Sequence, residues 1–121
     1  MTDAGQKGRT AEDAAAGYLR KQGYVLLARN FRCRAGEIDI VAADEKGELV
    51  FVEVRARLPL GFGSPEETVD ARKRTRLRRA AECYLLSRRQ GQPPCRFDVI
   101  GVVLDEPGRV VRIEHIKNAF E

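Results

Sequence analysis

The chain has 121 residues, of which 43% are hydrophobic and 33% are charged, so it suits one globular domain and is too short for two ordinary ones. The net charge of +4 favours polyanions such as nucleic acid as partners. The three cysteines lack a C-x-x-C pair, which argues against a zinc site or a disulfide scaffold, and no apolar run approaches the length of a membrane span. We therefore expect a reduced, cytoplasmic protein.

We predict a flexible terminus at residues 1–9 and a single domain at residues 10–121. Apolar residues recur at helical spacing over residues 11–22, and a glycine follows, which predicts a helix that ends there. Residues 24–30, 37–42 and 49–57 have the alternation or the β-branched content of strands. An arginine-rich loop joins the first two strands, and turn residues at 44–47 join the second to the third.

The second half opens with a loop at residues 58–63, which contain a proline and two glycines. Ser64, Pro65 and Glu67 have the spacing of a capping box with proline in the first turn, so a helix is predicted from there to residue 89. Residues 97–104 and 110–116 are predicted strands. The order α-β-β-β-α-β-β predicts a mixed α/β domain with a central sheet.

Two acidic residues interrupt the apolar runs of the second and third strands. If the turn is residues 45–47 with Gly47 in the left-handed conformation, antiparallel pairing places Val41 opposite Phe51. The same count places Asp39 opposite Glu53, with Cβ atoms roughly 4.5–5.5 Å apart. Like charges there are destabilising unless a cation or a shared proton lies between them. The register therefore predicts a site for Mg²⁺ or Mn²⁺, which can activate a water and neutralise charge on a phosphodiester.

Two helical residues lie where they could join this pair. Glu12 is at the edge of the apolar stripe of the first helix, and Lys73 lies one turn before Leu77 in the stripe of the second. The alternative for both is a boundary position with the charged head in water. A one-residue slip of the hairpin or a solvated sheet face would also remove the metal site.

A run of basic residues follows in the second predicted helix, where six of the eight residues from 72 to 79 are cationic. The low aromatic content of 7% disfavours stacking on single-stranded bases, so duplex or branched DNA is the expected partner. The alternatives are a solvated helix surface and an acidic protein partner. His115 alternates with Ile113 and is predicted to be a structural strand residue. The residues predicted to contact phosphates are Arg29, Arg32, Arg34, Arg72, Arg76 and Arg79.

The acidic pair is part of a longer pattern. Asp39, thirteen residues and then Glu53-Val54-Arg55 resembles the PD-(D/E)xK nuclease motif. The segments AEDAAAGYL, GEIDIVA, VFVEVRAR, FGSPEETVDARK, CRFDVI and IEHIKNAF are similar to the YraN family of bacterial predicted endonucleases, which is related to archaeal Holliday junction resolvases. The resemblance implies a restriction-endonuclease-like sheet flanked by helices, with Asp39 and Glu53 as metal ligands and Glu12 as a further one.

The chain departs from the nuclease motif at Arg55, where the motif prefers lysine. Arginine stays protonated and cannot act as a base, but it can clamp a phosphate or stabilise a developing oxyanion. It could instead pair with Glu37 in the predicted register, and Lys73 could supply the missing amine from the helix. We expect a metal-dependent endonuclease-like protein that acts on DNA, including branched DNA; the alternative is a catalytically degenerate DNA-binding module. A homodimer, which would suit a junction resolvase, stays open.

Overall fold

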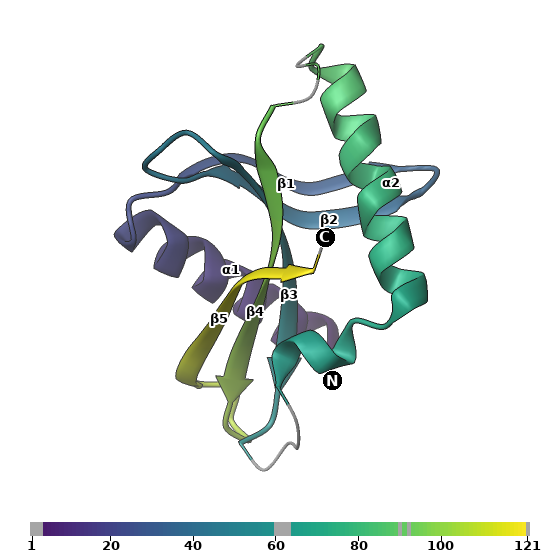
Figure 1. Ribbon diagram of the computed structural model, residues 1–121. Helices are drawn as coiled ribbons and strands as arrows, with labels where there is room; N and C mark the ends of the chain where they lie inside the picture. The colour runs from purple at the N-terminus through teal and green to yellow at the C-terminus, as the bar shows by residue number, and fades with distance from the viewer. Residues whose placement is uncertain (1–3, 60–63, 90, 92, 121) are drawn as a thin grey trace.

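A five-stranded sheet with two long helices makes up the described part of the chain, residues 4–59, 64–89, 91 and 93–120 of a computed structural model (Figure 1). The predicted α/β class and the order α-β-β-β-α-β-β are confirmed. Within these ranges, no helix is long and apolar enough to cross a membrane. The elements are α1 (Ala4–Lys21), β1 (Val25–Cys33), β2 (Gly36–Ala43), β3 (Leu49–Arg57), the short 3₁₀ helix η1 (Pro65–Thr68), α2 (Ala71–Ser87), β4 (Cys95–Leu104) and β5 (Val110–Phe120).

The sheet has the strand order β1-β2-β3-β4-β5, with β3 and β4 parallel and the other neighbours antiparallel. Figure 1 shows α1 behind the sheet and α2 in front of it. Leu19 of α1 belongs to the same buried cluster as Val52, and Tyr84 of α2 to the same cluster as Phe51. Burial on both faces explains why β3 begins with an unbroken apolar run instead of a simple alternation.

The β2–β3 hairpin has the register that the sequence predicts. Val41 pairs with Phe51, and Gly47 adopts a φ of 86° in the turn. The Asp44 side chain stabilises this turn, because Oδ1 accepts the N–H groups of Lys46 and Glu48, each at 2.9 Å. The hairpin therefore holds the two strands in one fixed alignment up to the point where their pairing ends.

Helix α1 and strand β1 are both longer than predicted. The helix begins at Ala4 instead of residue 11, so the segment expected to be flexible is helical from Ala4 onward, and residues 1–3 lie outside the described residues. Extending an existing helix adds one hydrogen bond per residue, so a capping pattern at Thr10 does not force a start there. Strand β1 continues to Cys33, which places Arg32 on a strand instead of in a loop.

The single helix predicted from residue 64 to 89 is two helices. Ser64 and Glu67 do form the predicted contact, since Glu67 Oε1 accepts the Ser64 N–H at 2.6 Å. However, Val69 is extended (φ −105°, ψ 92°), and Asp70 begins α2 by accepting the Lys73 N–H at 2.9 Å. Asp70 is as good an N-cap as Ser64, so the sequence contains two start signals and the second opens the long helix.

Candidate active site

The two predicted carboxylates line one cavity between α2 and the β2–β3 hairpin. Its volume is about 520 Å³. Asp39 comes from β2, just past the last main-chain pair of the hairpin, Ile40 with Val52. Glu53 follows directly on β3, so both carboxylates are held by strands at the same point of the sheet. The lining residues are Gly36, Glu37, Asp39, Glu53, Asp70, Arg72, Lys73, Arg76 and Leu77.

Asp39 is a carboxyl group that resists ionisation. Burial raises its pKa from 3.8 to about 7, and the nearby charge of Glu53 contributes to the rise. Acting in the opposite sense, the Val54 N–H donates to Asp39 Oδ2 at 2.8 Å and stabilises the carboxylate. This hydrogen bond joins β2 to β3 just beyond Ile40 and Val52, where the main-chain pairing of the two strands ends. A bound cation would offset the same repulsion that protonation of Asp39 relieves.

Glu53 is 5% exposed, and two cations meet one of its oxygens. Lys73 Nζ lies 2.7 Å from Glu53 Oε2, and Arg55 Nη1 lies 3.4 Å from the same atom. A buried carboxylate needs such partners, because leaving it unpaired would be costly. Lys73 therefore reaches the sheet from α2 and contacts Glu53, as its position in the helical stripe predicts. The suggested Arg55–Glu37 pair is wrong, because Glu37 lies beside Arg32 in the β1–β2 register and binds it at 2.9 Å.

The carboxylate pair fits a hard divalent cation by its donor type. Asp39 and Glu53 supply oxygen ligands and negative charge on rigid strands, which Mg²⁺ and Mn²⁺ favour. Among residues 4–59, 64–89, 91 and 93–120, no three His, Cys, Asp or Glu side chains gather closely enough to hold a metal ion by themselves. Water or substrate would therefore fill most of the coordination shell, as is usual for Mg²⁺.

Glu12 lies near the carboxylate pair but is held by other partners. Its Oε1 accepts from Asn30 Nδ2 at 2.9 Å and pairs with Arg29 Nη2 at 3.2 Å. It is not among the residues that line the cavity. Its charge still acts on Asp39, where it helps to raise the pKa of that carboxyl after burial and Glu53. A role for Glu12 as a metal ligand stays a prediction.

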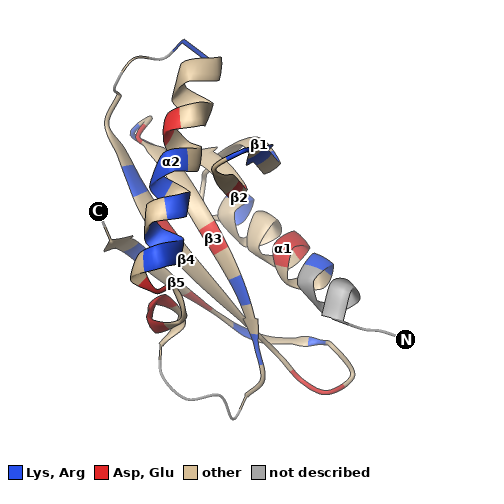
Figure 2. Ribbon diagram, turned by 90° about the vertical axis from the view of Figure 1, so that its right-hand side faces the viewer, with Lys and Arg blue, Asp and Glu red and all other residues tan. Residues whose placement is uncertain are grey.

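The predicted phosphate contacts divide into two groups. Arg72 and Arg76 line the cavity, and Arg79 is exposed on the same helix; Figure 2 shows basic residues along α2 beside an acidic position on β3. Arg29 is instead bound to Asp13 at 2.7 Å, and Arg32 to Glu37. Arg34 is exposed in the β1–β2 turn. The structure therefore brings the helical arginines, more than those of β1, to the carboxylates.

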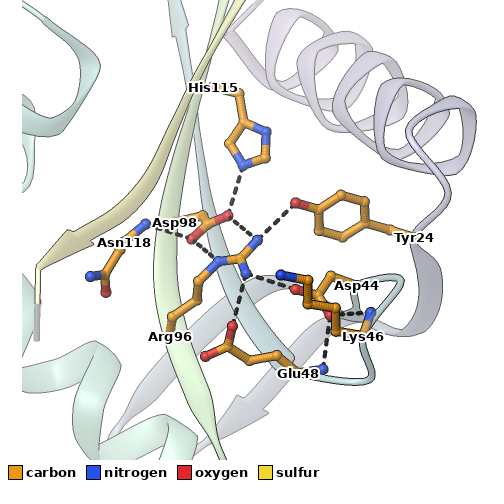
Figure 3. Close-up of polar contacts among 8 residues, drawn as sticks. All are labelled: Tyr24, Asp44, Lys46, Glu48, Arg96, Asp98, His115 and Asn118. Atoms are coloured by element: carbon orange, nitrogen blue, oxygen red, sulfur yellow. Dashed lines mark hydrogen bonds and ion pairs between the residues drawn. The ribbon is translucent and has the colours of Figure 1, made fainter.

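A buried polar network was missed in the sequence. Asp98 of β4 is fully buried and accepts from Arg96 Nε at 3.0 Å and from the Asn118 N–H at 2.9 Å (Figure 3). His115 Nε2 lies 2.7 Å from Asp98 Oδ2, and since a carboxylate only accepts, this nitrogen carries a proton. His115 Nδ1 lies 2.9 Å from the Tyr18 hydroxyl. The expectation that His115 is structural agrees with these contacts.

Arg96 extends this network to the hairpin. Its guanidinium binds Asp44 at 2.8 Å, Glu48 at 3.0 Å and the Tyr24 hydroxyl at 2.8 Å. The network thus joins β4 and β5 to the turn that sets the hairpin register. The available signal was the acid inside the apolar run CRFDVI, the same kind of interruption that drew attention to Asp39.

The raised pKa of Asp39 predicts a pH-dependent stability that Asp39→Asn should remove. Below pH 3.8, which is the ordinary pKa of this carboxyl, Asp39 is protonated in the folded and unfolded states alike. As pH rises from there to about 7, the unfolded chain releases a proton that the folded chain keeps, so wild-type stability falls. The asparagine variant should match wild type at low pH and exceed it above neutrality. Urea midpoints measured across this range test it, and parallel curves for the two proteins would contradict it.

Comparison with known proteins finds a matching family model and close relatives. The model of the family described as "Uncharacterised protein family UPF0102" matches residues 11–102. A UPF0102 protein of Moorella thermoacetica is 53% identical over 115 residues, which cover 95% of each chain. One from Desulforamulus reducens is 47% identical over 114 residues, 93% of each chain. Among solved structures, an EndoMS–dsDNA2 complex gives a TM-score of 0.36 and 17% identity, covering 78% of this chain and 35% of that one.

Proposed function

The chain belongs to the uncharacterised protein family UPF0102, and within that family we propose that this protein is a divalent-metal-dependent endonuclease acting on DNA. One observation carries the proposal: Asp39, Glu53 and Lys73 meet in a single cavity, although they come from two strands and the opposite helix. An open cavity with acids on the sheet and cations on the helix suits a phosphodiester, whose negative charge needs both a metal ion and basic groups.

The carboxylates would hold the metal ion, and the helix would hold the DNA. When bound, Mg²⁺ or Mn²⁺ would supply an activated water and neutralise charge on the phosphate. Arg72 and Arg76 line the cavity and would contact flanking phosphates, which would fix the backbone without reading the sequence. The charge of α2 therefore supports binding of duplex DNA of any sequence.

Lys73 is our candidate to replace the lysine of the nuclease motif, because this chain has Arg55 at that position. Its amine lies 2.7 Å from Glu53 Oε2, and Lys73 lines the cavity where substrate would enter. From there it can donate to a phosphate oxygen as charge develops. Arg55, on the same carboxylate at 3.4 Å, is a positioning residue in this scheme, because it holds Glu53 in place.

Cleavage of linear duplex and four-way-junction DNA with Mg²⁺, Mn²⁺ or EDTA tests the proposal. We expect metal-dependent cleavage, and faster cleavage of the junction would support branched DNA as the substrate and a homodimer as the active form. Binding of DNA and metal without any cleavage would replace the proposal with the degenerate binding module, which Arg55 favours. If the logarithm of DNA affinity did not change with the logarithm of salt concentration, the nuclease and the DNA-binding module would both be excluded. An acidic protein would then be the remaining partner.

Replacing Lys73 with methionine is expected to change metal affinity and cleavage in opposite directions. Loss of a cation 2.7 Å from Glu53 leaves the carboxylates more negative, so Mg²⁺ should bind up to about 5-fold more tightly, the limit for a partly exposed ion pair. Cleavage should fall roughly 10²–10³-fold if the amine stabilises developing charge. Calorimetry and single-turnover cleavage measure the two effects. Arg76→Met, which removes another cation from the same cavity, is the control for lost charge and lost phosphate contact. Equal effects of both variants at saturating DNA would contradict a specific role for Lys73.

A further inference from the structure

Asn30 interrupts the regular alternation of strand β1. Its φ is 55°, so it adopts the left-handed conformation, which is uncommon for residues other than glycine. In a regular strand, successive side chains point to opposite faces of the sheet. Here two successive side chains meet the same atom, because Arg29 Nη2 lies 3.2 Å and Asn30 Nδ2 lies 2.9 Å from Glu12 Oε1. The backbone of Asn30 therefore lets β1 hold one carboxylate of α1 with two donors.

The same residue lies beside the candidate active site. The main-chain pairs on either side, 29 with 40 and 31 with 38, place Asn30 opposite Asp39 of β2. Residues opposite each other in an antiparallel pair have Cα atoms about 4.5–5.5 Å apart. Glu12 is one hydrogen bond further away, so its carboxylate lies near that of Asp39 without lining the cavity. The contribution of Glu12 to the raised pKa of Asp39 agrees with this placement.

The partners of Glu12 fix its position but leave it negatively charged. Arg29 lies closer to Asp13, at 2.7 Å, than to Glu12, so one guanidinium serves two carboxylates. These three side chains together carry a net negative charge. Asn30 adds a donor without adding charge, because an amide is neutral and a carboxylate only accepts. The hydrogen bond from Asn30 therefore holds the Glu12 carboxylate without cancelling its charge.

We propose that Asn30 is a positioning residue of the carboxylate site: it holds Glu12 near Asp39 and thereby strengthens the binding of a divalent cation by Asp39 and Glu53. The inference rests on the proposed function, because the cation is the one that these two carboxylates are proposed to hold. A third negative charge attracts the cation most strongly when its side chain is held close. Groups that support a metal site from outside contribute about 10–100-fold in metal affinity. Asn30 is exposed and shares Glu12 with Arg29, so we expect a smaller contribution of about 3–10-fold.

The test measures Mn²⁺ affinity by calorimetry, without DNA, for the wild type and for Asn30→Gly. Glycine adopts a positive φ readily, so this variant keeps the backbone conformation and loses only the amide. We expect the dissociation constant to rise about 3–10-fold. Asn118→Gly is the matched control, because Asn118 is also an exposed strand residue with a positive φ, of 51°. Its main-chain N–H binds Asp98, and glycine keeps that group, so Mn²⁺ affinity should not change.

A double-mutant cycle shows whether Asn30 acts through Glu12. In a Glu12→Gln background the charge that Asn30 holds is gone, so adding Asn30→Gly should change Mn²⁺ affinity less than about 2-fold. An equal loss of affinity in both backgrounds, or equal affinities of wild type and Asn30→Gly, would overturn the inference. In either case, wild type that binds Mn²⁺ and cleaves DNA would keep the proposed function. Wild type that binds no Mn²⁺ would overturn the proposed function and this inference together.

Discussion

Replacing Glu53 with glutamine is expected to reduce Mg²⁺-dependent DNA cleavage by more than about 100-fold. Glutamine keeps the shape of the side chain but loses the charge that holds Lys73 and that would hold the proposed metal ion. Loss of an outer-shell partner already costs roughly 10–100-fold in metal affinity or activity, and Glu53 is proposed as a direct ligand. The same loss is expected for Asp39→Asn. Single-turnover cleavage at saturating Mg²⁺ measures it, with calorimetry reporting metal affinity separately.

Glu37→Gln is the matched control for these two variants. Glu37 lines the same cavity and is also acidic, but it is exposed and paired with Arg32. Its replacement should change cleavage less than about 5-fold, as expected for a surface ion pair. Cleavage that persists at the wild-type rate in Glu53→Gln would indicate a contaminating nuclease and would remove the proposed site.

The hairpin and its carboxylates could be predicted from sequence because local rules fix them. The turn at Gly47 sets the strand alignment, and alternation along each strand then decides which side chains share a face. The position of Lys73 followed from helical spacing relative to Leu77, because the apolar stripe must face the sheet. These inferences needed only neighbours in the chain or one tight turn.

The Arg55 and Glu12 partners could not be predicted in the same way, because they depend on distances between elements. Arg55 selects Glu53 on its own strand, since Glu37 is already taken by Arg32 of a strand that proved longer than expected. Glu12 is held by Arg29 and Asn30 of β1, a contact between two elements that helical spacing alone does not reveal. A boundary error of a few residues therefore explains the Arg55 partner, and the unknown approach of α1 to β1 explains the Glu12 partners.

The Asp98 network could not be predicted from sequence because its members come from separate elements: the segment after α1, the hairpin turn, β4 and β5 (Figure 3).

Asp98→Asn is expected to destabilise the fold by roughly 3–5 kcal/mol, as breaking a buried ion pair does. Four donor contacts reach the two Asp98 oxygens. Asparagine has one acceptor oxygen, and its NH₂ group takes the place of the second carboxylate oxygen. The protein donors that bonded this second oxygen would lose their hydrogen bonds and would face the NH₂ hydrogens.

The same variant should change how stability depends on acid. Burial acts to raise the pKa of Asp98, but His115, Arg96 and the Asn118 N–H together hold it below 3.8. A lowered pKa means that Asp98 stabilises the fold above 3.8 and loses this contribution as pH falls through its folded pKa. The gap in unfolding free energy between wild type and Asp98→Asn should therefore narrow below about pH 4 in urea titrations. Asp105→Asn, in an exposed turn with Arg109, should cost less than about 1 kcal/mol at any pH. If Asp98→Asn were equally mild, Asp98 would not hold the hairpin to β4 and β5.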